Sequence, residues 1–431
     1  MTETTKKVSE IIFREDLYPR INRDPKLVQK YAENVEMLPA IEINQHNELI
    51  DGWHRLTAHK TVKAEEILVT ITETKTDIEF LALAIQRNAA HGMQLSEEDK
   101  KSMAVRLFNS GTGYDEDKIH TILSVSTRSV RAYLKNIKDN LAEEQNKIIF
   151  DMWMACYTQE EIAKKVGLSQ PTVVERTKLL SDLERLPKPI KLSALYQDAD
   201  WQPPIYNIWN FAKKTNEVSH FGNSEQRIVD NLLYTFTQPF DIVVDPFAGG
   251  GSTIDVCKTR SRRFYVSDRI PIPAREHEIR LHDIKDGVPP LNKNWSEVSL
   301  TYLDPPYWKQ AEGKYSDDPT DLANMSRDEF NKALSGIVKG IASKQSSGVI
   351  ALLIQPTQWN TDDAHSYADH VTDIVEKVGN KKLTLENRIS CPYSTEQCTP
   401  QQVEWAKADR KLLVIARELI VWRVEDARGT V

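Results

Sequence analysis

The eight residues TYLDPPYW, Thr301 to Trp308, combine an acid, two prolines and two aromatic side chains at the end of an apolar stretch. Proline donates no backbone hydrogen bond and fixes φ, so two prolines in succession end a strand. The result is a rigid turn that presents the Asp304 carboxylate, bare carbonyl groups and the ring of Tyr307. We expect such a turn to form a pocket for a flat ligand with polar edges.

A second candidate lies upstream, in IVVDPFAGGGST, Ile242 to Thr253, where an apolar strand ends in Asp245 and meets a glycine-rich turn and a helix. Glycines let a backbone approach a ligand closely and take positive φ. Such a turn can serve a dinucleotide, a nucleoside, or only a tight connection between strand and helix. No Gly-Lys-Ser/Thr follows, which argues against a P-loop.

Two further acids follow in order along the chain. The segment RRFYVSD ends in Asp268, at the strand position from which a carboxylate holds a ribose hydroxyl. The segment RLHDIKDGVPPL offers Asp283, in a place suited to an adenine amino group. One acid at a strand end is common without any function, but the ordered series of glycine turn, two acids and DPPY is harder to explain by structure alone.

This series resembles the amino-methylating DNA methyltransferases, which use S-adenosylmethionine, over about Ile205 to Val424. DPFAGGG is similar to their first cofactor motif, and DPPY is similar to their catalytic tetrapeptide. The resemblance implies that the cofactor contacts come from Asp245, Pro246, Phe247, Gly249, Gly251, Asp268 and Asp283. It implies catalytic roles for Asp304, Pro305, Pro306 and Tyr307. The segment SHFGNSEQRIVDNLL, Ser219 to Leu233, is similar in part to the helix that flanks the methionine end of the cofactor.

The resemblance also explains the acid and the prolines. The exocyclic amine of a base is a poor nucleophile, because its lone pair is delocalised into the ring. Asp304 and the carbonyl of Pro305 can accept both amine hydrogens and free that lone pair, through positioning and preorganised electrostatics. Tyr307 is expected to stack on a base that has left the duplex. In this family DPPY goes more often with adenine than with cytosine, and similar tetrapeptides occur in enzymes that methylate proteins or RNA.

The stretch from Leu95 to about Lys191 has a helical pattern throughout. Within it, YTQEEIAKKVGLSQPTVVERTKLL predicts a helix-turn-helix, with Gly167 in the turn and Ser169 as the cap of the second helix. Three residues are expected to face a DNA groove, namely Gln170, Thr172 and Arg176. A helical hairpin that binds nothing is the alternative.

The preceding stretch, YDEDKIHTILSVSTRSVRAYLKNIK, has similar spacing but places Ser124 where the turn glycine would stand. Basic residues recur in it at three- and four-residue steps and therefore share one helical face: Arg128, Arg131, Lys135 and Lys138. Such a stripe suits a phosphate backbone, although a solvated helix face is an equal alternative.

Near the N-terminus, DGWHRLTAH places Gly52 after an apolar strand and puts His54 and Arg55 in the first turn of a helix. This arrangement suits an anion at a helix N-terminus. It resembles the ParB-like N-terminal domain, whose Gly-x-x-Arg box binds nucleotide phosphates, and the resemblance continues into IQRNAAHGMQLSEED. Gly52, His54 and Arg55 are therefore the candidate nucleotide or phosphate site. Because partition proteins carry another arginine where His54 stands, a module kept for DNA docking or dimerisation is an open alternative.

The composition is that of a globular protein with two or three domains: 431 residues, 40% hydrophobic, 28% charged and a net charge of −7. A net negative charge means that any DNA contact needs a local basic face. Four cysteines without a CxxC pair indicate reduced thiols and no metal site. The N-terminal residues lack the apolar core of a signal peptide and no apolar run is long enough to span a bilayer, so we expect a cytoplasmic protein.

We predict an α/β protein in three parts: a ParB-like domain at 1–94, a helical helix-turn-helix region at 95–191, and a Rossmann-like S-adenosylmethionine-dependent methyltransferase domain at 200–431. The last part is expected to hold a parallel sheet with strands at IVVDPF, RRFYVSD, VSLTYLD, GVIALLIQ and KLLVIAREL.

The predicted activity is methyl transfer to an amino group of a base in double-stranded DNA. Adenine is favoured over cytosine as that base, and the ParB-like domain and the helix-turn-helix region are expected to aid DNA recognition. Two alternatives are a DNA-binding partition-type or regulatory protein with an inactive methyltransferase fold, and a methyltransferase for RNA or protein. The sequence leaves open whether the protein forms a homodimer, binds a nucleotide at its N-terminal domain, or works with a restriction partner.

Overall fold

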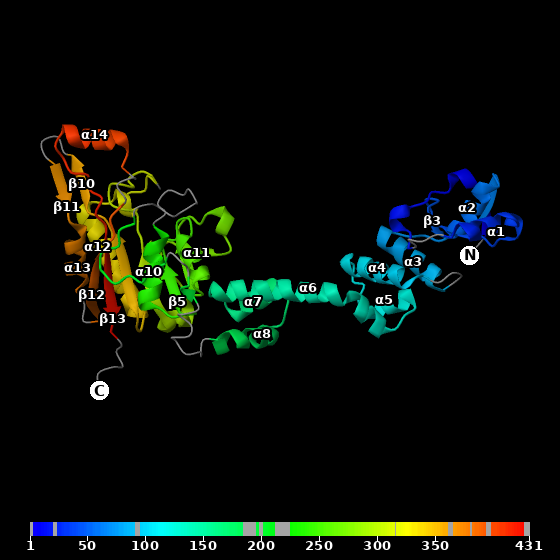
Figure 1. Ribbon diagram of the computed structural model, residues 1–431, viewed down its shortest axis with the longest axis horizontal. Coiled ribbons are helices and arrows are strands. Elements are labelled where there is room, and N and C mark those ends of the chain that lie inside the picture. Colours follow the sequence, from blue (N-terminus) through cyan, green and yellow to red (C-terminus); the bar gives the residue numbers. More distant parts are fainter. Residues whose placement is uncertain are drawn as a thin grey trace. The chain divides into compact units, whose positions relative to one another are not determined.

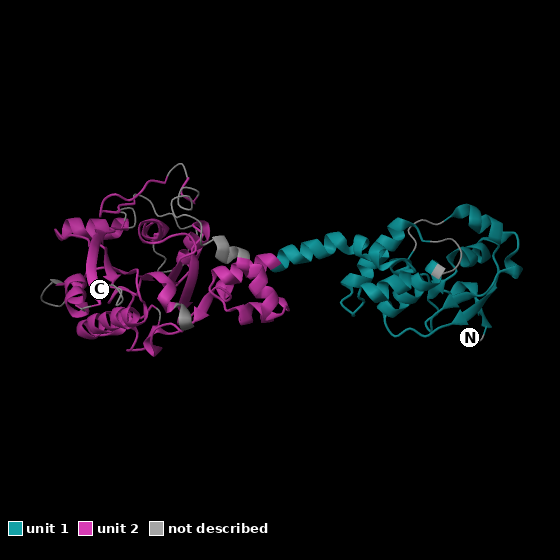
Figure 2. Ribbon diagram, turned by 90° about the horizontal axis from the view of Figure 1, so that it is seen from below, with its two compact units in different colours: residues 1–145 teal, residues 146–431 magenta. Residues whose placement is uncertain are grey.

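The computed structural model describes residues 3–19, 24–90, 95–183, 195–197, 201–211, 225–314, 316–360, 365–379, 382–393 and 398–425. The chain divides into two compact units, residues 1–145 and residues 146–431 (Figure 2). This division falls inside the region that the sequence predicts to be one helical domain. The three-part division stays a prediction, and its boundary residues 94, 191 and 200 lie outside the described ranges.

The first unit begins with a small sheet in the order β1-β4-β2-β3 among the described residues. Its elements are β1 (Glu3–Lys7), α1 (Pro25–Ala32), β2 (Ile41–Ile43), β3 (Leu49–Asp51), α2 (Trp53–Thr61), β4 (Glu66–Ile71) and α3 (Asp77–Ala90). β4 pairs parallel with β2 and antiparallel with β1. Ile41, Ile43, Leu49, Leu56 and Val69 are buried together and form the core that holds α2 against the sheet.

Three helices complete this unit: α4 (Glu97–Asn109), α5 (Glu116–Leu123) and the first part of α6 (Thr127–Met154). The start of α4 that the sequence predicts at Ser96 is confirmed, because the Ser96 hydroxyl accepts the backbone N–H of Asp99 at 3.1 Å. The Asp99 carboxylate accepts the backbone N–H of Ser96 in return, also at 3.1 Å. This reciprocal pair satisfies two N–H groups that a helix start otherwise leaves free.

Helices α5 and α6 repeat the arrangement of α7 (Gln159–Val166) and α8 (Gln170–Leu183). The turn between each pair contains one residue in the left-handed region, Ser124 with φ 52° and Gly167 with φ 68°. Two buried residues recur at matching places, Val130 in α6 and Val173 in α8. The serine-containing copy therefore has the same local fold as the glycine-containing copy, although left-handed backbone costs serine more than glycine.

The second unit holds a seven-stranded sheet among the described residues, in the order β12-β13-β9-β8-β5-β6-β7. Its strands are β5 (Ile242–Asp245), β6 (Arg263–Asp268), β7 (Ile279–Leu281), β8 (Val298–Leu303), β9 (Val349–Ile354), β12 (Leu383–Ser390) and β13 (Glu418–Val424). The pairs from β7 to β9 are parallel. β13 runs antiparallel to both β9 and β12, so the expectation of a wholly parallel sheet is wrong at this edge.

The last predicted strand, KLLVIAREL, is also misplaced. The residues from Lys411 to Arg417 precede β13, and Leu412 is 85% exposed. The stretch that enters the sheet is ELIVWRV, in which Glu418 pairs with Ile354 and Arg423 pairs with Val349. The apolar run after Lys411 therefore lies outside the sheet, and only its last residues reach the strand that forms.

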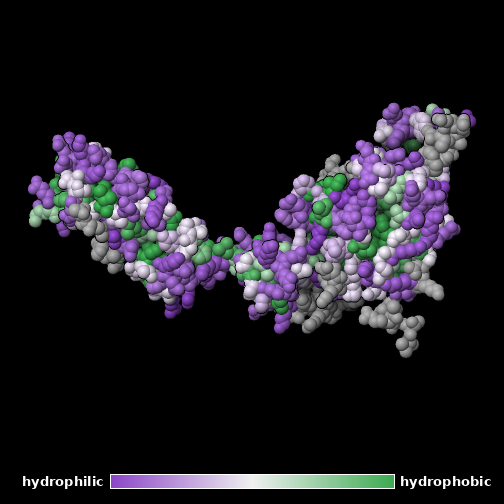
Figure 3. Space-filling model, turned by 180° about the vertical axis from the view of Figure 1, so that it is seen from behind, coloured by the Kyte–Doolittle hydropathy of each residue, from purple (hydrophilic) through white to green (hydrophobic). Residues whose placement is uncertain are grey.

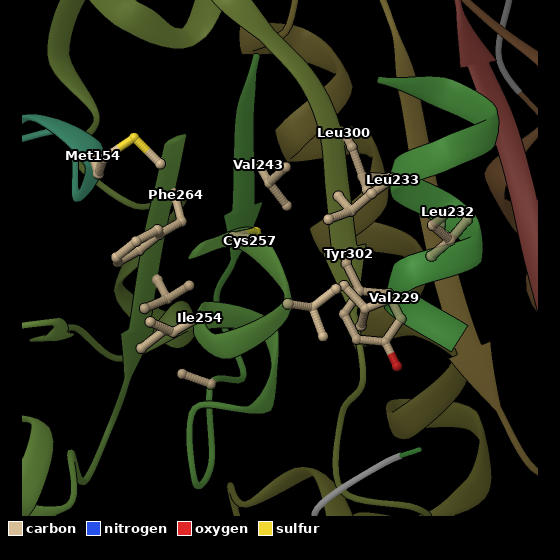
Figure 4. Packing of buried hydrophobic residues seen from close by; sticks show 14 of the residues in the cluster. Met154, Val229, Leu232, Leu233, Val243, Ile254, Cys257, Phe264, Leu300 and Tyr302 are labelled. Atoms are coloured by element: carbon tan, nitrogen blue, oxygen red, sulfur yellow. The ribbon is translucent and has the colours of Figure 1, made fainter. Parts of the chain in front are cut away.

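Helices cover both faces of this sheet (Figure 1). They are α10 (Gln226–Phe236), α11 (Ser252–Thr259), α12 (Arg327–Lys344) and α13 (His370–Val378). Figure 4 shows Val229 and Leu233 of α10 beside Val243 of β5 and Leu300 of β8, all of them in one buried cluster. A second cluster joins α12 and α13 to the other face. The flanking helix that the sequence predicts from Ser219 appears as α10, and its first residues lie outside the described ranges.

A short hairpin of β10 (Thr357–Asn360) and β11 (His365–Ala368), together with α14 (Pro400–Ala408), completes the described part of the unit. On the face drawn in Figure 3, hydrophilic residues make up most of the surface of each unit, with smaller hydrophobic areas between them. Within the described ranges, no helix has both the length and the apolar character needed to cross a membrane.

Candidate active site

A cavity of about 1510 Å³ lies at the carboxyl ends of β5, β6, β8 and β9. Ligands of open α/β sheets bind at this edge, where the turns after the strands converge. Nine of the residues singled out in the sequence line it: Pro246, Phe247, Gly249, Asp268, Asp283, Asp304, Pro305, Pro306 and Tyr307. Asp245 and Gly251 are not among its lining residues.

Asp245 organises the glycine turn from beneath. Its carboxylate accepts the backbone N–H of Phe247 at 2.9 Å and the hydroxyl of Thr253 at 2.6 Å. The side chain is buried, and this burial raises its pKa to about 7. Both carboxylate oxygens therefore hold the turn in place, and the side chain acts on a ligand through the turn.

The turn itself needs glycine at two places. Gly251 has φ 82° and begins α11, and a Cβ there would lie 2.9 Å from Cδ of Arg275. Gly249 has φ 50°, and its N–H donates to Asp268 at 2.9 Å. Side chains at these positions would strain the backbone. The bond from Gly249 to Asp268 joins the turn after β5 to the end of β6.

The two strand-end acids are held by neighbouring groups. Asp268 accepts the backbone N–H of Ile270 at 2.9 Å, and Asp283 accepts the backbone N–H of Lys285 at 3.0 Å. Arg269 lies 4.0 Å from the Asp283 carboxylate and donates to Asp321 at 2.8 Å. The acids thus line the cavity in fixed orientations, and Arg269 connects them to the segment that follows DPPY.

The tetrapeptide begins directly after β8. The Tyr307 hydroxyl donates to the Asp304 carboxylate at 3.0 Å. Burial, followed by the negative charge of Asp304, raises the pKa of Tyr307 well above its usual value, so the hydroxyl keeps its proton. Trp308 is buried and its Nε1–H donates to the Met325 carbonyl at 2.8 Å. Trp308 therefore packs behind the turn, while Asp304 and Tyr307 line the cavity.

The lining residues that the sequence analysis did not single out include Gln355, Tyr393 and Arg417. Gln355 follows β9 and Arg417 precedes β13, so the pairing of Ile354 with Glu418 brings them to the same edge of the sheet. A signal existed for Gln355, because it is the polar residue that directly follows the apolar strand VIALLI. Tyr393 and Arg417 have no such local signal, since their position depends on the pairing of distant strands.

The end of α6 and the turn between α6 and α7 contact the other end of the parallel strands. The Trp153 ring packs 5.7 Å from the ring of Phe240, just before β5, and the Arg263 guanidinium at the start of β6 lies 4.6 Å from the Trp153 ring centre. The Tyr157 hydroxyl donates to the His277 carbonyl, before β7, at 2.6 Å. These contacts lie at the amino ends of the strands, whereas the cavity lies at the carboxyl ends.

The three residues predicted to face a DNA groove from α8 have different surroundings. Gln170 is exposed. The Thr172 hydroxyl lies 2.8 Å from the Ser169 hydroxyl in the helix cap, and Arg176 donates to Asn146 at 3.2 Å. Two of the three side chains therefore already have partners within the second unit.

The basic stripe on α6 is formed as the helical spacing predicts, and its four side chains are exposed. Arg131 and Lys138 both pair with Glu116, at 2.9 and 2.5 Å. Arg128 and Lys135 make no ion pair within the described ranges. The stripe therefore offers two cations that are unpaired there and two that share one carboxylate.

The N-terminal candidate site is bonded within its own unit. Gly52 takes φ 107° and begins α2. Arg55 pairs with Asp51 at 2.7 Å and donates to two main-chain carbonyls just before β2. The His54 ring accepts the backbone N–H of Asp24 at 3.2 Å. These contacts give Arg55 and His54 structural roles in holding the start of α2.

The comparison with protein families matches residues 114–271 to the model of a DNA methylase family, N6_N4_Mtase. The matched residues include the glycine turn and β6, and they end before Asp304. The match supports an amino-methylating DNA methyltransferase, as the motifs led us to expect. The predicted α/β fold, with a mostly parallel sheet that follows a smaller α/β domain in the chain, is confirmed.

Two curated relatives are regulatory proteins of streptomycetes. The chain is 31% identical over 108 residues to the "Streptomycin biosynthesis operon possible regulatory protein" of Streptomyces griseus. The matched segment is 25% of this chain and 31% of that protein. The chain is 26% identical over 104 residues to the transcriptional regulator NovG of Streptomyces niveus, which covers 24% of this chain and 32% of that protein. The chain thus spans about a third of the length of these relatives.

Solved structures similar to this chain include ParB proteins. One is the C-terminally truncated chromosome-partitioning protein ParB from Caulobacter crescentus complexed to the centromeric parS site, with 11% identity and a TM-score of 0.25 over 44% of this chain and 89% of that chain. Another is a Pnob8-like ParB-N domain, with 12% identity and a TM-score of 0.27 over 46% of this chain and 90% of that chain.

Proposed function

We propose that this chain transfers a methyl group from S-adenosylmethionine to the exocyclic amine of a base in double-stranded DNA, with adenine as the preferred base. The observation that carries the proposal is the cavity at the carboxyl edge of the sheet. It brings the glycine turn, Asp268 and Asp283 together with the turn from Asp304 to Tyr307. The proposed nucleoside site and the proposed amine-binding turn therefore line one cavity.

The residues present fit S-adenosylmethionine. The cavity is larger than the roughly 300–1,000 Å³ of common small-molecule sites, so a cofactor and a base can occupy it together. Gly249 and Gly251 leave the turn without side chains, and Asp268 presents a carboxylate at the end of β6. When bound, this cofactor supplies an electrophilic methyl group on a sulfonium ion.

The chemistry at the base follows from the turn at the end of β8. The amine of the target donates its hydrogens to Asp304 and to the carbonyl of Pro305, which draws the nitrogen lone pair out of the ring. The freed lone pair would then be able to attack the methyl group that bound S-adenosylmethionine supplies, and the Asp304 carboxylate would accept the proton that the nitrogen gives up. Tyr307, which is half-buried beside Asp304, stacks on the base.

Adenine is proposed over cytosine because DPPY in the family that this chain resembles goes more often with adenine. Both bases carry an amine next to a ring nitrogen, and both satisfy the turn in the same way. The base is therefore assigned by product analysis, which distinguishes N6-methyladenine from N4-methylcytosine.

DNA recognition is proposed to involve α5–α6 and α7–α8. Arg128 and Lys135 offer exposed charges to phosphates, and neither is paired within the described ranges. Because α7–α8 is attached at the amino ends of the strands, the duplex that it holds is expected to be a different segment from the one that supplies the target base. The ParB-like part is proposed as a module for DNA docking or dimerisation, because Arg55 is already committed to Asp51 and to main-chain carbonyls.

A regulatory protein with an idle methyltransferase fold is the second candidate, and the names of the two curated relatives favour it. The hydrogen bond from Tyr307 to Asp304 and the shared cavity favour the enzyme. The experiment that separates them offers labelled S-adenosylmethionine to the protein together with duplex DNA, RNA or a mixed protein extract. We expect label on duplex DNA. Label on RNA or protein would redirect the proposal, and binding of cofactor without any transfer would support the regulator.

A further inference from the structure

The wall of the cavity opposite Asp304 carries a buried arginine. Arg417 is 3% exposed and lines the cavity just before β13. Its guanidinium lies over the Tyr393 ring, with 3.9 Å between the guanidinium carbon and the ring centre, and its Nε–H donates to the Cys391 carbonyl at 3.0 Å. Arginine stays charged at every pH at which proteins fold, so this wall keeps a fixed positive charge.

No carboxylate within the described ranges forms an ion pair with Arg417. Burial works to lower the pKa of Arg417, but the neighbouring Tyr307, Tyr393, Asp304 and Tyr302 side chains raise it above its usual value. A buried cation without a paired acid is costly unless donor groups find acceptors. The stacked and bonded geometry fixes the plane of the guanidinium, and a fixed plane of donors suits recognition of a flat acceptor edge.

Gln355 stands beside Arg417 on the neighbouring strand. Its Nε2–H donates to the Val414 carbonyl at 3.1 Å, which fixes the orientation of the amide. Its Oε1 is buried and has no hydrogen-bond partner among the described residues, and the residue is 4% exposed. An orphaned buried acceptor on a cavity wall indicates that the wall is built to meet a ligand.

The spacing of the strands allows one base to contact both Arg417 and Asp304. Arg417 directly precedes β13, while Gln355 and Asp304 directly follow β9 and β8, and these three strands are successive neighbours in the sheet. Adjacent strands lie about 4.8 Å apart, so the outer two of these residues start about 10 Å apart. The long arginine side chain and the aspartate can therefore approach opposite parts of one ring system.

We propose that Arg417 and Gln355 form the specificity wall of the target pocket, in which the Arg417 guanidinium donates a hydrogen bond to the ring nitrogen beside the amine of the flipped base. The Gln355 oxygen lies on the same wall and repels the carbonyl oxygen that a keto base would bring to it. Adenine and cytosine carry an amine next to a ring acceptor, whereas guanine and thymine reverse this order. The wall thus selects amino bases by attraction and rejects keto bases by repulsion.

This inference rests on the proposed function. Its test combines one protein variant with one base analogue, in the manner of a double-mutant cycle. The full chain and its Arg417→Met variant are assayed on DNA in which the methylated base is replaced by an analogue without the ring nitrogen. The analogue is 1-deazaadenine for adenine or 3-deazacytosine for cytosine, and 7-deazaadenine, which keeps the ring nitrogen bonded to the amino carbon, is the control. Binding of S-adenosylhomocysteine and thermal unfolding are measured alongside, because a folded pocket must still take the cofactor product.

For the wild type we expect one analogue to raise KM by about ten- to a hundredfold, the loss of one hydrogen bond to a charged donor. For Arg417→Met we expect a similar rise of KM on natural DNA and little further rise of KM on that analogue. The effects of the substitution and of the analogue on KM should therefore not add. Arg417→Lys should recover part of the loss. Gln355→Met should weaken the preference for an amino base over a keto base in competition binding.

Arg423→Met is the matched control, because Arg423 lies in β13, its side chain is 49% exposed and it pairs with Glu386. We expect its KM and its response to the analogues to equal those of the wild type. Additive losses in the Arg417 cycle, or an unchanged KM in Arg417→Met, would overturn the inference while leaving the methyltransferase proposal intact. A wild type that labels no DNA base would overturn both.

Discussion

The Tyr307 hydroxyl donates a hydrogen bond to the Asp304 carboxylate at 3.0 Å, so the stacking residue and the acceptor of the proposed mechanism are joined within one turn. Two prolines separate them and fix the backbone between them. The aromatic ring therefore orients the carboxylate as well as covering the base. This double role leads to a prediction that separates the two contributions.

Tyr307→Phe keeps the ring and removes the hydroxyl, whereas Tyr307→Ala removes both. We expect Phe to lower kcat modestly, by the equivalent of about 1 kcal/mol, because one hydrogen bond to the carboxylate is lost. Ala should also raise KM for DNA, since stacking of one base contributes about 1–3 kcal/mol. Steady-state kinetics with both variants checks this, and equal KM values for Phe and Ala would argue against stacking.

Gly251→Ala should impair cofactor binding. The residue has φ 82°, a conformation that strains the backbone of an alanine, and the new Cβ would lie 2.9 Å from Cδ of Arg275, so the Arg275 side chain must also move. The matched control is Gly336→Ala in α12, where a Cβ meets nothing within 4 Å. There alanine should stabilise the helix by about 0.5–1 kcal/mol. Calorimetric titration with S-adenosylhomocysteine and thermal unfolding report the two effects, and equal cofactor affinity in both variants would contradict the role given to the turn.

The stability of the protein should carry a pH dependence from Asp245. Burial raises its pKa to about 7, whereas an unfolded aspartate titrates near about 4. Between these values the folded protein holds a proton that the unfolded chain has released, so a rise in pH favours unfolding. Relative to Asp245→Asn, the free energy of unfolding of the wild type should fall from about pH 4 to about pH 7 and then level off. Urea unfolding of both proteins across this range tests the sign, and parallel curves would refute it.

The ion pairs of the basic stripe on α6 predict that substitutions of its four cations affect DNA binding unequally. Arg128→Ala and Lys135→Ala should each weaken duplex binding and lower the slope of log affinity against log salt by about 1. Arg131 and Lys138 already share Glu116, so their removal should matter less. Glu116→Gln should strengthen binding, because it leaves both cations without their carboxylate. Salt titrations of duplex binding measure these slopes, and a uniform effect of all four substitutions would exclude the ion pairs as the cause.

Truncation distinguishes two domain boundaries. The structure divides the chain after residue 145, whereas the sequence predicts that the helical region ends at residue 191. Removal of residues 1–190 takes away Trp153, which packs on Phe240 and Arg263, and Tyr157, which bonds to His277. Loss of a buried tryptophan costs about 3–5 kcal/mol. Removal of residues 1–145 keeps these contacts. We expect the longer deletion to lower the melting temperature well below that of the shorter one, and equal melting temperatures would show that α6–α8 is separable.

The position of the candidate site was predictable because its residues lie in contiguous motifs. IVVDPFAGGG, RRFYVSD and TYLDPPYW each carry an apolar strand that ends in an acid, so the strand ends and the family resemblance were enough to predict that Asp268, Asp304 and Tyr307 lie at one edge. The capping box at Ser96 and the helical hairpins followed from equally local signals. The left-handed Ser124 fits its predicted place in the turn.

What the sequence could not supply depends on contacts between distant segments. The apolar run after Lys411 predicts a strand, but the register with β9 selects the residues from Glu418 onward. Gln355 and Arg417 meet only because that register exists. The attachment of α7–α8 to the amino ends of β5 and β6 rests on Trp153, Arg263 and Tyr157, and a helical pattern alone does not reveal it.

The most direct test of the central claim is nucleoside analysis of DNA after incubation with the full chain and isotopically labelled S-adenosylmethionine. Asp304→Asn serves as the comparison, because it keeps the shape of the side chain and removes its charge. The proposed function predicts label in N6-methyladenine with the wild type and a loss of about a hundredfold or more in the variant. Label in N4-methylcytosine would keep the mechanism and change the base. No labelled nucleoside, or equal labelling by Asp304→Asn, would contradict the account.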